Sequence, residues 1–126
     1  MAASSGSLHE APSALNPELI DRHRAIVSIM EELEAVDWYD QRVEATDDEE
    51  LAAILAHNRD EEKEHAAMVL EWLRRRDPKL DEHLRNYLFI DQTPLEREEE
   101  LEGNGEQNQI SDGSLGIGSL RAEVTS

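Results

Sequence analysis

The chain has no cysteine, few aromatic residues and no long apolar run, and each absence excludes a class of protein. Without cysteine, disulfides, thiolate metal sites and iron–sulfur clusters are excluded, so any metal ligand must be an oxygen or an imidazole nitrogen. Phe, Trp and Tyr make up 4% of the 126 residues, so a lone chain buries little apolar surface and burial between chains is expected. The sequence has neither a membrane-spanning run nor, over residues 1–7, a secretory signal. We therefore expect a soluble, intracellular protein.

Basic residues are scarce as well. The sequence has 12 Lys and Arg against 30 Asp and Glu, which gives a formal net charge of −18. Such a chain would repel the phosphates of nucleic acid, so nucleic acid is excluded as a partner. Its field attracts cations. Acidity also simply keeps proteins soluble, so the charge alone does not choose between these two interpretations.

Helix-forming residues dominate between about positions 16 and 76, which predicts an all-α protein. Asn16-Pro17-Glu18 is typical of a helix start, and this first helix is expected to reach about Val43. Thr46 and Glu49 match a capping box for a second helix that reaches about Arg76. So short a connection requires an antiparallel hairpin.

Four segments are expected along the chain. Residues 1–15 are small and polar and are predicted to be disordered, and residues 16–90 form a half-bundle domain that includes a third, short helix over about 79–88. Residues 91–112 are acidic and without period, which predicts a flexible linker. In residues 113–126, the stretch Gly113–Arg121 carries isolated apolar residues among small ones, so it is expected to dock in extended form on another protein.

The second helix carries two polar residues within its apolar stripe. At 100° per residue, six apolar side chains share one face, namely Leu51, Ile54, Leu55, Val69, Trp72 and Leu73. Glu62 and His65 lie within the same arc, where a charge is costly unless it is paired or binds a metal. A surface ion pair is the alternative, and their place in the stripe argues against it.

The Glu-x-x-His spacing is typical of one half of a ferritin-like di-iron site. Such sites take one Glu from each of two helices and a Glu-x-x-His from each of two others, because residues three apart share a helix face. This chain offers Glu32, Glu62 and His65, and lacks the second pair of helices. A two-fold homodimer would supply them, so that two hairpins complete a four-helix bundle around the metals. Carboxylate and imidazole ligands suit Fe(II), Mn(II) or Zn(II).

Other residues on the two helices allow two interpretations each. Tyr39 points in nearly the same direction as Glu32 and either adjoins the site or packs as an ordinary amphipathic residue. Glu31 and Glu34, one turn apart, either collect cations or form a solvated acidic face, with Trp38 beside them as an exposed aromatic or an interface anchor. The remaining histidines are expected to be structural or solvated.

The stretches Arg22–Ser28, Glu31–Tyr39 and His57–His65 together closely resemble the encapsulated ferritins. These are ferritin-like proteins carried as cargo inside bacterial encapsulin shells. The resemblance covers about residues 17–90, and Gly113–Arg121 looks like the peptide that docks such cargo on the shell interior.

The resemblance implies a function and an assembly. It implies that Glu32, Glu62 and His65 bind iron between two subunits, that Tyr39 adjoins this centre, and that Glu31 and Glu34, with Trp38 nearby, form a metal-uptake site. Dimers would assemble into a ring-shaped decamer in the bacterial cytoplasm, within the encapsulin nanocompartment. The protein would oxidise Fe(II), while the shell stores the mineral.

Two non-catalytic alternatives stay open. The chain could be a helical cargo or adaptor protein whose acids are structural. It could also hold Ca²⁺ or Zn²⁺ statically for assembly, because hard cations bind carboxylates too.

Overall fold

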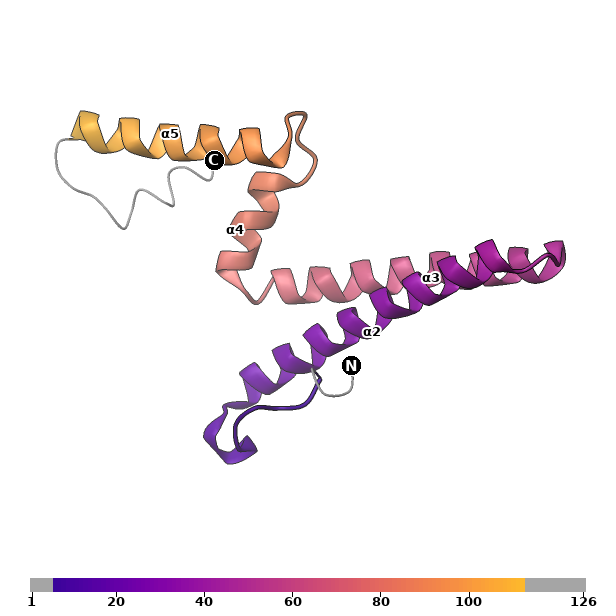
Figure 1. Cartoon of the computed structure of the whole chain (residues 1–126). Helices are drawn as coiled ribbons and strands as arrows, with labels where there is room; N and C mark the ends of the chain where they lie inside the picture. Colours follow the sequence, from indigo (N-terminus) through magenta and orange to yellow (C-terminus); the bar gives the residue numbers. More distant parts are fainter. Residues whose placement is uncertain (1–5, 113–126) are drawn as a thin grey trace. The chain divides into compact units, whose positions relative to one another are not determined.

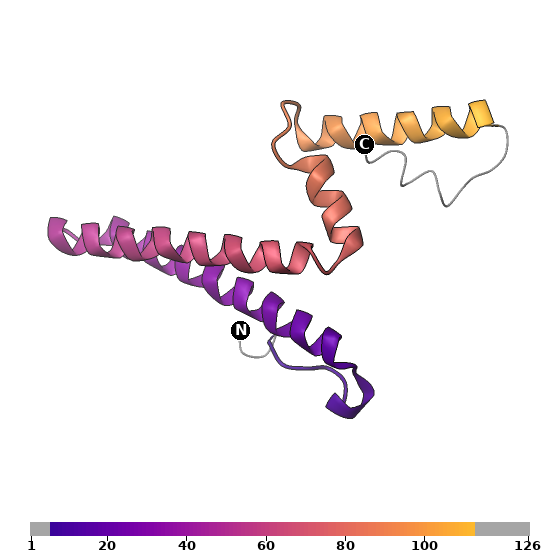
Figure 2. The same ribbon diagram turned by 180° about the vertical axis from the view of Figure 1, so that it is seen from behind.

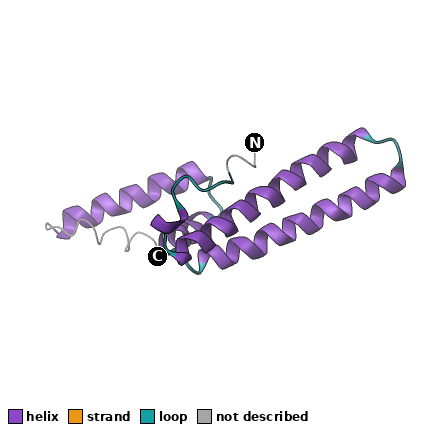
Figure 3. Cartoon of the chain, turned by 90° about the horizontal axis from the view of Figure 1, so that it is seen from below, coloured by secondary structure: helices purple, strands orange, loops and turns teal. Residues whose placement is uncertain are grey.

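The computed structural model of the chain describes residues 6–112, with side chains described as far as Asn104. Over this range the chain forms helices and loops without a strand (Figure 3), which confirms the predicted all-α fold class. None of the described helices is long and apolar enough to cross a membrane. Internal contacts divide the chain into two compact units, residues 1–76 and 77–126.

The first unit is an antiparallel hairpin of two long helices, α2 (Pro17–Ala45) and α3 (Glu49–Arg74), which lie side by side (Figures 1 and 2). The predicted start of α2 is confirmed. The side-chain oxygen of Asn16 accepts a hydrogen bond from the Leu19 N–H at 2.7 Å, and Pro17 occupies the first helical position.

The predicted capping box of Thr46 and Glu49 at the start of α3 is wrong. Helix α2 continues to Ala45, and Thr46 closes it by donating its N–H to the Arg42 carbonyl at 3.1 Å. Asp48 caps α3 instead, its side chain accepting from the Leu51 N–H at 3.0 Å. The Thr46 hydroxyl oxygen accepts from the Asp48 N–H at 3.1 Å rather than from the first turn of α3, and the loop is confined to residues 46–48.

The core of the hairpin is narrow. Ala25, Ala66 and Leu73 are its buried apolar residues, and none of the described side chains is completely buried. The small alanines let the two helices approach closely. Several large apolar side chains of the hairpin stay exposed, including Ile26, Leu33, Leu51, Ile54 and Met68. A single chain therefore leaves much of its apolar surface uncovered, as the composition predicts.

Ahead of the hairpin, the predicted disorder over residues 1–15 does not hold for the residues around Pro12. A short 3-10 helix, η1 (Pro12–Ala14), precedes α2. Pro12 restricts the backbone, and the N–H groups of Ala14 and Leu15 donate to the carbonyls of Ala11 and Pro12 at 2.8 and 3.1 Å. Residues 1–5 lie outside the described range.

The second unit begins with α4 (Pro78–Tyr87), the predicted short helix. Asp77 caps it by accepting a hydrogen bond from the Leu80 N–H at 3.0 Å. The positive φ of Phe89, 59°, marks the turn that follows.

Helix α5 (Pro94–Asp112) occupies the stretch predicted to be a flexible linker, so that prediction is wrong over this range. Thr93 and Glu96 form a reciprocal capping box. The Thr93 N–H donates to a carboxylate oxygen of Glu96 at 3.1 Å, and the Glu96 N–H donates to the Thr93 hydroxyl oxygen at 3.2 Å. Arg97 donates to the Asn86 carbonyl at 2.9 Å, and Leu101 is buried. Local capping and these contacts outweigh the acidic composition. Gly113–Arg121 lies outside the described residues.

Candidate metal centre

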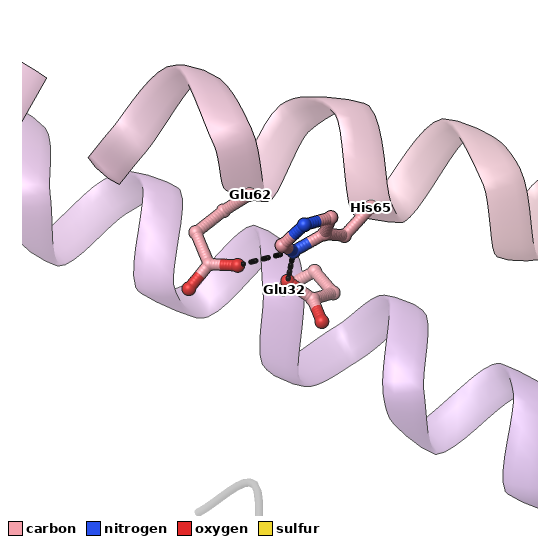
Figure 4. Close-up of side chains that lie close together, drawn as sticks. All are labelled: Glu32, Glu62 and His65. Atoms are coloured by element: carbon pink, nitrogen blue, oxygen red, sulfur yellow. Dashed lines mark hydrogen bonds and ion pairs between the residues drawn. The ribbon is translucent and has the colours of Figure 1, made fainter. Parts of the chain in front are cut away.

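Three potential metal ligands come together between the two helices of the hairpin (Figure 4). Glu32 comes from α2, and Glu62 and His65 come from α3. One ligand atom from each residue lies within 4.8 Å of the other two. Nδ1 of His65 is 3.0 Å from a carboxylate oxygen of Glu62 and 3.6 Å from one of Glu32. The three predicted ligand residues therefore converge on one point.

The helices position these side chains for local reasons. Glu62 and His65 are three residues apart in α3, so both side chains project from the same face. The short loop over residues 46–48 folds α2 back along α3 and brings Glu32 across from them. The Glu32 and Glu62 side chains are 26% exposed and His65 is 46% exposed, so the cluster opens to solvent on the His65 side.

The close approach of the two carboxyl groups shifts their pKa values in opposite directions. A hydrogen bond with Glu62, followed by burial, raises the pKa of Glu32 above its ordinary value. The bond with Glu32 and a second one with His65 lower the pKa of Glu62. The bond with Glu62 also raises the pKa of His65.

This set of donors fits a divalent metal ion. Two carboxylates and one imidazole suit borderline cations such as Fe(II), Mn(II) or Zn(II). Three protein ligands on an open face leave coordination positions free for further ligands. The arrangement has the donors for binding a metal and the access for exchanging it.

Tyr39 is in contact with Arg42 on the same helix. Its ring is half-buried, and the Arg42 guanidinium is 5.7 Å from the ring centre. The same guanidinium lies 6.0 Å from the ring of Trp38, which is exposed. Trp38, Gln41 and Arg42 line a shallow cavity of about 230 Å³. The predicted role of Tyr39 beside the metal stays a prediction.

The predicted metal-uptake residues lie outside the cluster. Glu31 is exposed and Glu34 is half-buried, and both belong to α2. Their one-turn spacing matches the sequence interpretation, but it is equally that of a solvated acidic face. This role, too, stays a prediction.

One contact near the site, between Arg59 and Asp40, is not predicted by the sequence patterns. Arg59 of α3 reaches across the hairpin to Asp40 of α2 at 3.0 Å. The middle of the loop, residue 47, lies seven residues after Asp40 and twelve before Arg59, so folding the sequence back about the loop does not place the two opposite each other. The length of the Arg59 side chain closes the offset, which residue spacing does not predict.

Comparisons with known proteins bear on the family and the fold of the chain. The sequence profile of the EncFtn-like family matches residues 7–91. An encapsulated ferritin-like protein of Rhodospirillum rubrum is 61% identical over 133 residues, which cover 98% of this chain and 94% of that protein. An encapsulin nanocompartment cargo protein, EncC of Myxococcus xanthus, is 42% identical over 59 residues, 47% of this chain and 45% of that protein.

A solved structure is also similar. The crystal structure of protein ne0167 from Nitrosomonas europaea has 59% sequence identity and a TM-score of 0.68. The similarity covers 70% of this chain and 97% of that one. Together with the profile match, which spans both helices of the hairpin and every candidate ligand, these likenesses establish that the chain belongs to the EncFtn-like family of ferritin-like proteins.

Proposed function

We propose that this protein is a ferroxidase that oxidises Fe(II) to Fe(III) at a di-iron centre shared by two subunits. The observation that carries the proposal is the convergence of Glu32, Glu62 and His65 from two helices within 4.8 Å. Membership of a ferritin-like family supports iron as the substrate. These three side chains are the metal ligands that one chain contributes to the centre.

A second copy of the chain completes the centre. One chain supplies three donor groups on an open face, which is half of the set that a ferritin-like di-iron site uses. Ile54 and Met68 are exposed and share the face of α3 that carries His65. A two-fold contact over this face would bury both apolar side chains and bring the two clusters together into a four-helix bundle.

The chemistry is an electron transfer from the bound substrate ions. Two Fe(II) ions lose one electron each, and the two electrons reduce dioxygen to peroxide or peroxide to water, with protons taken from solvent. The four carboxylates of two subunits favour Fe(III) over Fe(II), because their negative charge stabilises the higher cation charge. The open face between subunits lets the product leave.

The remaining assignments rest on the family resemblance. Tyr39 adjoins the di-iron centre, and Glu31 and Glu34, with Trp38 nearby, take up metal from solvent. Dimers assemble into a ring-shaped decamer. Gly113–Arg121 docks the ring on an encapsulin shell, so the protein works in the bacterial cytoplasm inside that compartment and feeds Fe(III) to the mineral stored there. The names of the Rhodospirillum rubrum and Myxococcus xanthus relatives support the association with a shell.

One assay separates this function from its alternatives. Fe(II) oxidation in air is followed by the absorbance of Fe(III) for the wild type and for Glu32→Ala, Glu62→Ala and His65→Ala. We expect turnover by the wild type and loss of at least tenfold in each variant, since each removes a ligand. A helical adaptor would show no activity in any of the four proteins. A static Ca²⁺ or Zn²⁺ binder would take up metal without turnover.

A further inference from the structure

An ion pair ties the two helices of the hairpin together beside the candidate metal centre. Nη1 of Arg59 on α3 donates to a carboxylate oxygen of Asp40 on α2 at 3.0 Å, and Nε of the same guanidinium donates to Asp60 at 3.0 Å. The Arg59 side chain is 23% exposed, whereas that of Arg24, which pairs within α2, is 71% exposed. Arg59 is therefore held at two points and packed along the hairpin.

The pair lies between the ligand cluster and the loop. Arg59 precedes Glu62 by three residues, so the two side chains share a face of α3. Asp40 follows Glu32 by eight residues, about two helical turns along α2. Any axial slip of one helix against the other would thus stretch this ion pair and the ligand cluster together.

The cluster tolerates little slip. Its ligand atoms lie within 4.8 Å of one another. Sliding α3 by one residue would move its ligands by about 1.5 Å and rotate them by about 100°, and sliding it by one turn would move them by about 5.4 Å, more than the whole cluster spans. A working site therefore requires one defined register.

Apolar packing alone defines that register poorly. Of the three buried apolar residues of the hairpin, Ala25 and Ala66 carry only methyl groups, which are too small to interlock deeply. Leu73 is the one larger side chain among them, and it lies at the end of α3 away from the loop. Within the ligand cluster, the ion pair between the two helices joins His65 Nδ1 to a Glu32 carboxylate oxygen at 3.6 Å, which is long for a hydrogen bond. A directional contact elsewhere is needed to hold the helices in place.

We infer that the Arg59–Asp40 ion pair sets the register of α2 against α3 and so positions Glu32 opposite Glu62 and His65 before metal arrives. Arg59 and Asp40 are positioning residues that act through the helices rather than by touching the metal. The inference rests on the proposed function only in taking the cluster to bind a divalent ion.

The first test measures metal affinity. Zn(II), which is redox-inert, is titrated calorimetrically into the full-length protein, with Glu62→Ala as the reference for binding to other acids. We expect Arg59→Gln and Asp40→Asn each to weaken binding about two- to fivefold, the effect of losing a partly exposed ion pair between the helices. Arg59→Lys should recover part of the loss, and the charge exchange Asp40→Arg with Arg59→Asp should recover more. Arg24→Gln, which breaks an ion pair within one helix, should bind as the wild type does.

The second test reads the register without metal. Because the chain has no cysteine, spin labels attach only at the substituted positions Glu44→Cys on α2 and Ala67→Cys on α3, both exposed and far apart along the hairpin axis. Labelled chains are diluted with unlabelled ones so that pulsed EPR reports distances within one chain. We expect a single narrow distance distribution that broadens or shifts in Arg59→Gln and narrows again in the charge exchange.

The two readouts decide the inference together. Unchanged affinity in Arg59→Gln overturns it, and so does weakened affinity with an unchanged distance distribution, since register would then not be the cause. A loss explained by unfolding alone would appear as a smaller folded fraction by circular dichroism, and it would not be reversed by exchanging the charges. If the wild type binds no Zn(II) beyond the Glu62→Ala reference, the proposed function fails, while the EPR distances still decide whether Arg59 sets the register.

Discussion

The substitution Met68→Ala tests whether a second copy of the chain covers the His65 side of the hairpin. Met68 is three residues from His65 on the same face of α3, and its residue surface is 58% exposed in the single chain. Complete burial of a Met side chain is worth about 1.5–3 kcal/mol, so the part still exposed is worth about 1–2 kcal/mol. A two-fold contact buries it twice, and Ala keeps part of the buried surface, so Met68→Ala should weaken dimerisation by about 2–3 kcal/mol, or roughly 30- to 150-fold in Kd.

The assay is sedimentation velocity over a dilution series, run with a chelator present so that metal does not contribute. Lys63→Ala, an exposed substitution on the same helix, serves as the control and should leave the Kd unchanged. Adding Fe(II) without oxygen should then favour assembly of both proteins, because a ligand that needs two subunits stabilises their complex by mass action. A Kd for Met68→Ala within twofold of the wild type would refute the idea that this face is the interface.

Three further predictions concern the helices themselves. Asp48→Ala should lower the free energy of unfolding by about 1 kcal/mol through loss of the α3 cap, and urea denaturation checks this; an unchanged midpoint would contradict the cap. Gly103→Ala, where an added Cβ meets nothing within 4 Å, should stabilise α5 by up to about 1 kcal/mol and increase the circular dichroism at 222 nm, a change not expected of a flexible linker. Arg74 and Arg75 lower the pKa of Glu71 from 4.5 to about 2, so its stabilising contribution is complete above pH 4.5 and is lost as the pH falls toward 2. Glu71→Gln should therefore flatten the stability profile in that window, and the same acid loss in both proteins would argue against the pairing.

Helix starts were predictable where an N-cap residue is followed directly by proline at the first helical position. Asn16 and Asp77 are each followed by proline, and both cap the helices expected of them. The Thr-x-x-Glu pattern occurs twice in the sequence. At Thr46 it predicts a capping box that does not form, because α2 continues to Ala45 and Asp48 caps α3. At Thr93 the same pattern does form a capping box. The pattern indicates which capping hydrogen bonds the side chains can form. Whether these bonds form depends on where the preceding helix ends.

Helix α5 shows the limit of composition as a guide. The stretch after Pro94 is acidic and without apolar period, which predicts a linker. Two of its side chains nevertheless find partners in the same unit: Arg97 bonds to the Asn86 carbonyl, and Leu101 becomes buried. Such contacts join residues far apart in sequence, so no window of neighbouring residues contains the information that predicts them.

The sequence by itself determined what depends on helical periodicity: two long helices, a tight reversal, and a Glu and a His on one face, because a spacing of three residues has the same meaning in every α-helix. It also determined which chemistry was available, since a chain without cysteine offers only oxygen and imidazole ligands. Tertiary structure alone decided that Glu32 meets this pair and that Arg59 reaches Asp40. Contacts between helices depend on the register in which they pack, and register is a property of the assembled hairpin rather than of either helix.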